Sequence, residues 1–241
     1  MLWLPRGMAA DLPDTIVQAK PSVLPVGTFS ATDSPRFGFR GTGFVVGDGT
    51  LVATNFHVLP VAAEADSGPA MAVLTSRRSE AGQLRRARVV ATDRVHDLAV
   101  LRIEGAPLPA LELDAPEAAR EGQAVALMGF PIGGVLGFAP VTHRGIIASI
   151  TTAALPAATA QQLDPRALLR LREGNFAIYQ LDATAYPGNS GGPLLDAASG
   201  RVLGIVNMVL VKNGRESALS NPTGISYAIP VRHLQELIKG L

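Results

Sequence analysis

The chain has 241 residues, of which 47% are hydrophobic and 17% are charged, and its formal net charge is +1. This length allows one domain or two small ones with a sizeable core, and the balanced charge argues against nucleic acid as a partner, because phosphate neutralisation needs a concentrated basic face. The chain contains no cysteine, which excludes disulfides, thiol chemistry and cysteine-based zinc sites.

The N-terminal stretch MLWLPRGMAADLPD starts with an apolar run that is too short for a signal peptide and is interrupted by Pro5. The small residues of GMAAD are nevertheless typical of a cleavage site. We therefore expect a truncated export signal and an exported protein, periplasmic or secreted, with a cytoplasmic protein as the alternative. No later stretch is long and apolar enough to span a bilayer.

The first half of the chain is predicted to consist of short strands. Residues 41–58 have the pattern of a hairpin around the Asp48-Gly49 corner. Residues 70–76 and 85–93 predict a second hairpin, and residues 97–104 predict a further strand that ends at Gly105. The polar stretch Ala115 to Gly122 breaks this pattern and is the best candidate for a linker.

A second β-rich series follows the linker. The predicted strands and hairpins lie in residues 123–131, 141–150, 176–183, 192–210 and 224–230. Residues 163–174 carry an internal helix signal, with Asp164 as N-cap, Pro165 in the first turn and Gly174 at the end. Residues 231–241 predict an amphipathic C-terminal helix.

The stretch YPGNSGGPLLD, residues 186–196, surrounds Ser190 with three glycines. A serine becomes a nucleophile when an imidazole takes its proton, and a carboxylate usually holds that imidazole in the right tautomer. His57 follows a predicted strand and His96 stands next to Asp97. Taken singly, Ser190 could be a turn serine, His57 a strand-end histidine and Asp97 a turn cap. The other two histidines are His143 and His233, and His233, in the predicted C-terminal helix, is interpreted as a solvated or packing residue.

The motifs GTGFVV, VATNFHVL, HDLAVLRI and PGNSGGPLLD occur in this order. Together they resemble the trypsin-like serine peptidases of the HtrA/DegP branch, over roughly Gly41 to Pro230. The resemblance implies an all-β, chymotrypsin-like fold of two antiparallel six-stranded β-barrels with the active site between them. The first barrel would be residues 22–114 and the second 123–230, followed by the C-terminal helix, residues 231–241.

The resemblance implies a serine endopeptidase in which His57 is the general base, Asp97 the orienting acid and Ser190 the nucleophile. It assigns the oxyanion hole to the backbone N–H groups of Gly188 and Ser190. His96 is a rival base, although it faces away from Asp97 in an extended chain. Asp182 is an alternative candidate for the acid. We interpret it instead as a structural residue of the loop before the nucleophile.

The resemblance also indicates which residues wall the primary specificity pocket. They are Thr184, Ala185 and Tyr186 on one side and Asn207, Met208 and Val209 on the other. No carboxylate stands among them, so a substrate Arg or Lys would bury an unpaired charge, which is heavily disfavoured. We expect cleavage after small aliphatic residues in unfolded or flexible polypeptides.

Three departures from the family pattern bear on regulation. Asn189 stands where the digestive relatives have an aspartate, so the ion pair with a new N-terminus that activates those enzymes is not expected. HtrA proteins usually continue into PDZ domains, whereas no PDZ module is expected after Pro230. The segment from Thr151 to Asn175 is longer than expected and is interpreted as a tolerated surface insertion, with a regulatory loop as the alternative.

Two other function classes are alternatives for this sequence. A catalytically silent, trypsin-like binding module is the alternative to the peptidase. A metal-dependent hydrolase ranks last, because no histidine pair has metal-ligand spacing. The sequence thus predicts neither a metal nor a cofactor.

Overall fold

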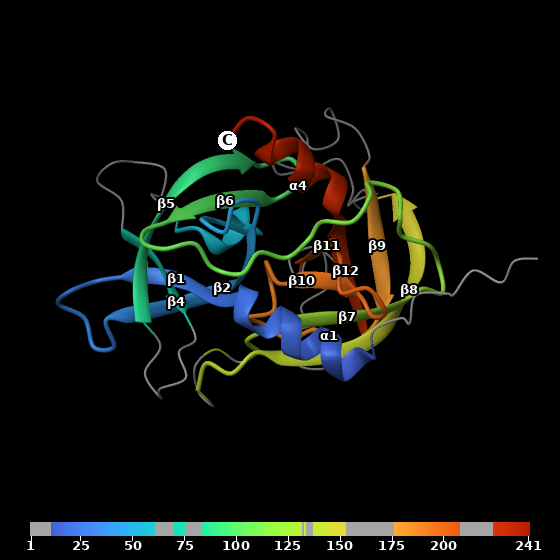
Figure 1. Cartoon of the computed structure of the whole chain (residues 1–241), viewed down its shortest axis with the longest axis horizontal. Helices are drawn as coiled ribbons and strands as arrows, with labels where there is room; N and C mark the ends of the chain where they lie inside the picture. Colours follow the sequence, from blue (N-terminus) through green and yellow to red (C-terminus); the bar gives the residue numbers. More distant parts are fainter. Residues whose placement is uncertain are drawn as a thin grey trace, which may run out of the picture.

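The computed structural model describes residues 11–60, 70–75, 83–131, 133, 137–152, 176–207 and 224–241. Two closed antiparallel barrels of six strands each lie side by side (Figure 1). The strand order is β1-β2-β3-β6-β5-β4 in the first barrel and β10-β11-β12-β9-β8-β7 in the second. This arrangement confirms the predicted all-β fold class.

The strands of the first barrel are β1 (Val23–Phe29), β2 (Phe37–Val46), β3 (Leu51–Asn55), β4 (Ala70–Thr75), β5 (Gln83–Asp93) and β6 (Leu98–Ile103). Those of the second are β7 (Ala124–Gly129), β8 (Val141–Thr152), β9 (Ala177–Asp182), β10 (Pro193–Asp196), β11 (Val202–Asn207) and β12 (Ile225–Pro230). The helical elements are α1 (Leu12–Ala19), the 3-10 turns η1 (Lys20–Ser22) and η2 (Phe56–Val58), and α4 (Val231–Ile238).

The β2–β3 hairpin shows how local chemistry sets the strand positions. The Asp48 carboxylate accepts hydrogen bonds from the backbone N–H and the hydroxyl of Thr50, at 2.9 and 2.6 Å. Gly49 has a φ of 85°, a conformation that glycine adopts without a steric penalty. The predicted corner at Asp48-Gly49 is therefore the observed turn.

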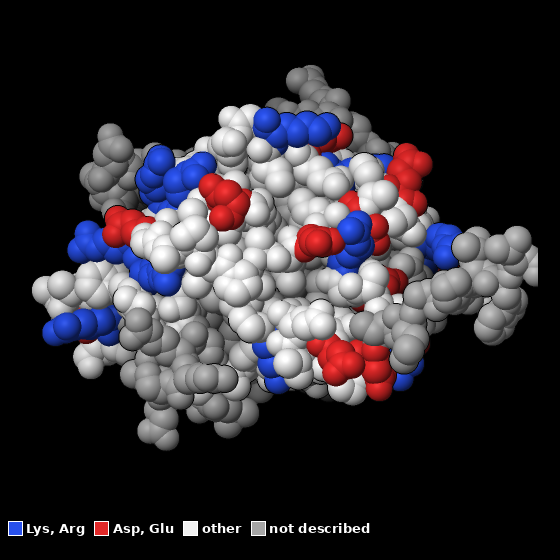
Figure 2. Space-filling view, in the orientation of Figure 1, with Lys and Arg blue, Asp and Glu red and all other residues white. Residues whose placement is uncertain are grey.

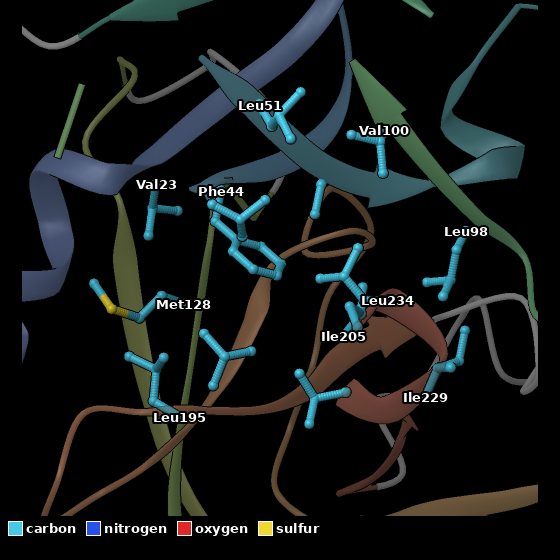
Figure 3. Packing of buried hydrophobic residues seen from close by; sticks show 14 of the residues in the cluster. Val23, Phe44, Leu51, Leu98, Val100, Met128, Leu195, Ile205, Ile229 and Leu234 are labelled. Atoms are coloured by element: carbon cyan, nitrogen blue, oxygen red, sulfur yellow. The ribbon is translucent and has the colours of Figure 1, made fainter. Parts of the chain in front are cut away.

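A shared core joins the two barrels. It contains Phe44 and Leu98 from the first barrel, Met128 and Ile205 from the second, and Leu234 from α4, all fully or almost fully buried (Figure 3). Each barrel also has its own interior cluster. Burying apolar surface from both barrels in one cluster opposes their separation, so loops of one barrel keep a fixed position against loops of the other.

The helix α1 was not predicted from the sequence. Asp11 caps it, with its carboxylate accepting from the N–H of Leu12 at 2.8 Å, and a proline lies in its first turn. Thr15 is buried, and its hydroxyl lies 3.5 Å from the carbonyl oxygen of Ala197 in the β10–β11 turn. The chain before the first barrel thus packs on the second barrel (Figure 1).

The helix predicted over residues 163–174 lies outside the described residues. So does most of the long segment from Thr151 to Asn175, of which Thr151 and Thr152 end β8. In the described part of the chain, no helix is long and apolar enough to cross a membrane. On the face shown in Figure 2, basic and acidic side chains are interspersed around a broad uncharged middle.

Candidate active site

The register of the first barrel places His57 beside Asp97. Strands β3 and β6 are antiparallel, with Asn55 opposite Leu98. The residues that follow β3 therefore lie next to the residue that precedes β6. The N–H of Phe56 donates to the Asp97 carbonyl at 3.0 Å, and the amide of Asn55 donates to the same oxygen at 3.0 Å.

The Asp97 carboxylate holds His57 at two points. Its Oδ1 accepts the backbone N–H of His57 at 2.9 Å, and its Oδ2 lies 2.6 Å from the imidazole Nδ1. A carboxylate oxygen accepts hydrogen bonds, so Nδ1 carries the proton and Nε2 of a neutral ring is left as the acceptor. The two side chains are about a quarter exposed, 28% for His57 and 24% for Asp97, which leaves the pair accessible to a substrate.

The backbone of Asp97 is also unusual. Its φ is 53°, in the left-handed region that few non-glycine residues adopt and that Asp tolerates better than most. The five hydrogen bonds to its carbonyl and carboxylate oxygens over-determine this conformation. Strained backbone that is fixed by its surroundings is typical of functional sites.

The fifth of these bonds comes from the second barrel. Asn207, at the end of β11 and 1% exposed, donates its side-chain amide to Asp97 Oδ2 at 2.7 Å. The carboxylate oxygen that contacts His57 thus accepts a second hydrogen bond from the other barrel. Sequence reasoning placed Asn207 on the pocket wall and did not foresee this contact.

Ser190 lies in the loop between β9 and β10 and is 6% exposed. Its carbonyl oxygen accepts the N–H of Thr42 in the first barrel at 2.9 Å, and the N–H of Gly191 donates to Val206 in β11 at 2.9 Å. A Cβ added to Gly191 would collide with the Thr42 carbonyl and would lie 3.0 Å from the N–H nitrogen of Asn55. The loop therefore sits directly against the end of β3, two residues before His57.

From Gly188 to Gly191, open backbone N–H groups, which have no acceptor among the described residues, alternate with N–H groups that donate a hydrogen bond. Those of Asn189 and Gly191 donate to the carbonyls of Tyr186 and Val206. Neither the N–H of Gly188 nor that of Ser190 donates to another described residue. The two open groups are the pair that the family resemblance assigns to the oxyanion hole, and a hydrogen-bond acceptor on a substrate could occupy them.

The Ser190 hydroxyl and the His57 imidazole, both described, are not hydrogen-bonded to each other. Such a bond is often long in the absence of substrate and tightens when substrate binds. The catalytic roles of His57, Asp97 and Ser190 and of the Gly188 N–H stay predictions.

The structure places four of the six predicted pocket residues. Thr184, Ala185 and Tyr186 follow β9, and Ala185 packs into the core of the second barrel. The Tyr186 ring lies 5.7 Å from that of His143 on β8, whose pKa is lowered by burial. Met208 and Val209 lie outside the described residues, and the pocket itself stays a prediction.

The rival base has another partner, and the rival acid lies on a strand. His96 pairs with Asp93 rather than Asp97, with Nδ1 2.6 Å from the carboxylate Oδ2. Burial favours a neutral Asp93, but hydrogen bonds from His96 outweigh it and lower the pKa of this carboxyl. Asp182 ends β9 between β8 and β12 and is exposed. The described residues contain no cluster of three or more metal-ligating side chains.

Comparison with known proteins agrees with the resemblance seen in the motifs. Residues 41–205 match the family described as the trypsin-like peptidase domain. A protein of Pseudomonas fluorescens named probable periplasmic serine endoprotease DegP-like is 31% identical over 191 residues, which are 79% of this chain and 32% of the relative. The mitochondrial serine protease HTRA2 of Bos taurus is 31% identical over 240 residues, which are 97% of this chain and 44% of the relative.

The chain thus spans less than half the length of these curated relatives. A crystal structure of the serine endoprotease from Yersinia pestis superimposes with a TM-score of 0.64 and 22% identity, covering 99% of this chain and 67% of that one, which shows a common fold. The family match runs from β2 into β11 and includes His57, Asp97 and Ser190. The chain therefore belongs to the trypsin-like peptidase domain family, with relatives in its HtrA/DegP branch.

Proposed function

We propose that the chain is a serine endopeptidase that hydrolyses peptide bonds through Ser190, His57 and Asp97. The observation that carries this proposal is the contact between the His57 Nδ1 and the Asp97 carboxylate, 2.6 Å apart, beside the glycine-lined loop of Ser190. An imidazole held in this tautomer by a carboxylate is the base that activates a serine hydroxyl.

In the proposed mechanism, Ser190 Oγ attacks the carbonyl carbon of the scissile bond while His57 Nε2 takes the hydroxyl proton. The imidazolium that forms is stabilised by Asp97. His57 then gives the proton to the leaving amine, and the C–N bond breaks to leave an acyl-enzyme. Water, deprotonated by His57, then attacks the ester carbon. The C–O bond to Ser190 breaks, the carboxylic acid product leaves, and His57 returns the proton to Ser190 Oγ.

Negative charge develops on the substrate carbonyl oxygen in both steps. The N–H groups of Gly188 and Ser190 are the proposed donors to this oxyanion, because neither is used by another described residue. Backbone donors fixed before the reaction need no reorganisation as the charge appears, and one such donor contributes about 100- to 1000-fold to kcat.

Ser190→Ala tests the proposal. We expect a folded variant whose kcat on casein falls on the order of a million-fold, as in other triad enzymes that lose the nucleophile. A purified Ser190→Ala variant with casein turnover within a few-fold of the original chain would contradict the assignment. A chain that binds casein but never cleaves it, with or without Ser190, would indicate the silent binding module instead.

For the substrate, we propose unfolded or flexible polypeptides cut after small aliphatic residues such as Val, Ala or Leu. Support comes from the uncharged side chains of Thr184, Ala185 and Tyr186 and from the engagement of the Asn207 amide with Asp97. Without a carboxylate in the pocket, a buried Arg or Lys would lack a partner.

Digestion of casein, with the new termini mapped by mass spectrometry, tests this preference. We expect Val, Ala and Leu to dominate the residues before the cuts. A set of cuts dominated by Arg and Lys would contradict it and would point to Asp182 as a carboxylate that reaches the pocket. Repeating the digest with Asp182→Asn decides whether that carboxylate is responsible.

We also propose that the protein is exported. Relatives named as periplasmic serine endoproteases support this location. Fractionation of cells that produce the chain from its native gene tests it, with the periplasmic or secreted fraction as the expected location. Recovery of the whole population with cytoplasmic markers would contradict it.

A further inference from the structure

The loop that carries Ser190 must keep its backbone in one conformation for the oxyanion donors to work. The side chain of Asn189, directly before Ser190, does not fix this conformation. Its side chain is fully buried, yet neither its amide nitrogen nor its amide oxygen has a hydrogen-bond partner within the described part of the chain. In the digestive relatives, an activating aspartate stands at this position. In this chain the side chain at the same position does not fix the loop.

Thr42, on β2 of the first barrel, contacts the loop at two points. Its backbone N–H donates to the Ser190 carbonyl at 2.9 Å. Its hydroxyl donates to the Gly188 carbonyl at 2.6 Å. These two carbonyls lie on either side of Asn189, so one residue of the first barrel holds both ends of the turn.

The hydroxyl of Thr42 is itself held in place. It accepts the backbone N–H of Phe130, just after β7, at 3.1 Å, and the Thr42 carbonyl accepts the Thr54 hydroxyl at 2.7 Å. A hydroxyl has one proton to donate. Because the Phe130 N–H can only donate and the Gly188 carbonyl can only accept, the Thr42 proton goes to Gly188. Thr42 is fully buried, so water does not compete for these bonds.

The backbone conformation of Gly188 must be fixed by contacts with other residues. Its φ is 102°, and a Cβ at this position would collide with the carbonyl oxygen of Phe130. Glycine adopts this conformation, but it also leaves it easily, since no side chain restricts φ and ψ. If the Gly188–Asn189 peptide turned over, its carbonyl would leave Thr42 and its N–H would leave the Tyr186 carbonyl. The peptides on either side, which carry the Gly188 and Ser190 N–H groups, would then lose a fixed neighbour.

We propose that Thr42 is a positioning residue for the oxyanion hole. Its hydroxyl and its N–H fix the Gly188 and Ser190 carbonyls, so that the N–H groups of Gly188 and Ser190 stay directed at the substrate oxygen. This role rests on the proposed function of Ser190 as the nucleophile. The nucleophile loop of the second barrel is then held by β2 of the first barrel rather than by an ion pair.

Thr42→Val tests the role, because valine has nearly the shape of threonine but no hydroxyl. We expect kcat on a peptide substrate to fall roughly ten- to a hundred-fold, less than the loss of a whole oxyanion donor, while KM changes less than three-fold. Thr42→Ser keeps the hydroxyl and should restore kcat to within a few-fold. Thr42→Ala removes the hydroxyl with no added methyl group and replaces Thr42→Val if that variant does not fold.

Thr75→Val is the matched control. Thr75 is also a buried threonine of the first barrel, and its hydroxyl donates to the Gln83 carbonyl at 3.1 Å in the β4–β5 hairpin. This variant removes one hydrogen bond where Thr42→Val removes two, so it should lower the melting temperature by a smaller amount and leave kcat unchanged.

The rate of labelling by a fluorophosphonate probe is measured in the same proteins. It distinguishes a failure of the positioning role of Thr42 from a failure of the nucleophile role of Ser190. If the original chain reacts with the probe, slow labelling in Thr42→Val with rescue by Thr42→Ser supports the positioning role. Labelling of Thr42→Val at the original rate, no rescue by Thr42→Ser, or equal slowing in Thr75→Val would overturn it while Ser190 remains the nucleophile. An original chain that does not react overturns the proposed function, and the role of Thr42 with it.

Discussion

The imidazole rings of His96 and His233 stack on each other, with their centroids 3.7 Å apart and their planes inclined by 18°. His96 lies in the β5–β6 turn of the first barrel and His233 on α4, after the second barrel. Phe176 packs edge-on against His96, with ring centroids 4.7 Å apart. Because Asp97 directly follows His96, this contact anchors the turn that carries the carboxylate of the site.

The buried His233 of this stack makes the free energy of unfolding depend on pH. Burial lowers the pKa of His233 to about 4, helped by the charges of His96 and Arg232 and opposed by Asp93. Glu236 lies 3.9 Å from its Nδ1. In the unfolded chain a histidine titrates at about 6.5. Between pH 6.5 and 4 the unfolded state therefore binds more protons than the folded state, and the free energy of unfolding falls as the pH falls.

We predict that His233→Phe, which retains an aromatic ring on His96, flattens this dependence. Urea unfolding at pH 7.5 and pH 5 measures it. The original chain should lose about 1–2 kcal/mol more than the variant between these two values, since one proton is worth about 1.4 kcal/mol per pH unit. The same pH dependence in both proteins would contradict the burial of a neutral His233.

Asp97→Asn should lower kcat by roughly ten-thousand-fold. The Asp97 Oδ2 accepts hydrogen bonds from His57 and from Asn207, and an amide at this position can present only one acceptor oxygen. The imidazole then loses its preference for the protonated Nδ1 tautomer. Steady-state kinetics on a peptide substrate check the prediction, with circular dichroism as the control for folding. An unchanged kcat would remove Asp97 from the mechanism.

Asn207→Ala should lower kcat about ten-fold or more, because a hydrogen bond to a charged group contributes about 1.5–3 kcal/mol. Asn55→Ala is its matched comparison. The Asn55 amide also contacts Asp97, but at the backbone carbonyl rather than the carboxylate. Both variants should melt at a lower temperature, and the larger loss of kcat should belong to Asn207→Ala. The reverse order would show that the Asn207 contact serves stability alone.

Gly188→Ala should both destabilise the fold and reduce kcat by at least ten-fold, since the added Cβ meets the Phe130 carbonyl and the φ of 102° is strained for alanine. Gly122→Ala separates these causes. Gly122 has a φ of 79° and open space around its Cβ position, so this variant carries the backbone strain without the collision. We expect it to cost about 1–3 kcal/mol and to leave kcat unchanged.

Most strands could be predicted from the sequence because they alternate or run apolar between turn residues. The hairpin at Asp48-Gly49 is a clear case, and the closing helix at Val231 could be predicted from its amphipathic pattern. Strand β1 had no predicted counterpart, since Pro25 and Gly27 interrupt its apolar run. Its register shifts between Val26 and Gly27, and it is held by pairing with β2 and β4. Tertiary pairing outweighs weak local propensity there.

The site was predicted through its motifs, not through its contacts. His57, Asp97 and Ser190 stand in short stretches that can be read locally. The Asn207 contact with Asp97 and the Thr42 contact with Gly188 join residues 110 and 146 positions apart. Such contacts depend on how two barrels pack, which no local pattern records. His233, interpreted from the sequence as a solvated or packing residue, is buried and stacks on His96.

Covalent labelling by a fluorophosphonate, followed by intact-mass measurement and peptide mapping, tests most directly whether Ser190 is the nucleophile. The original chain should gain a single adduct, located on Ser190, at the same rate with and without a chelator. Ser190→Ala should gain none. An adduct on another residue, equal labelling of both proteins, or labelling that the chelator abolishes would contradict the assignment of Ser190 as a metal-independent nucleophile.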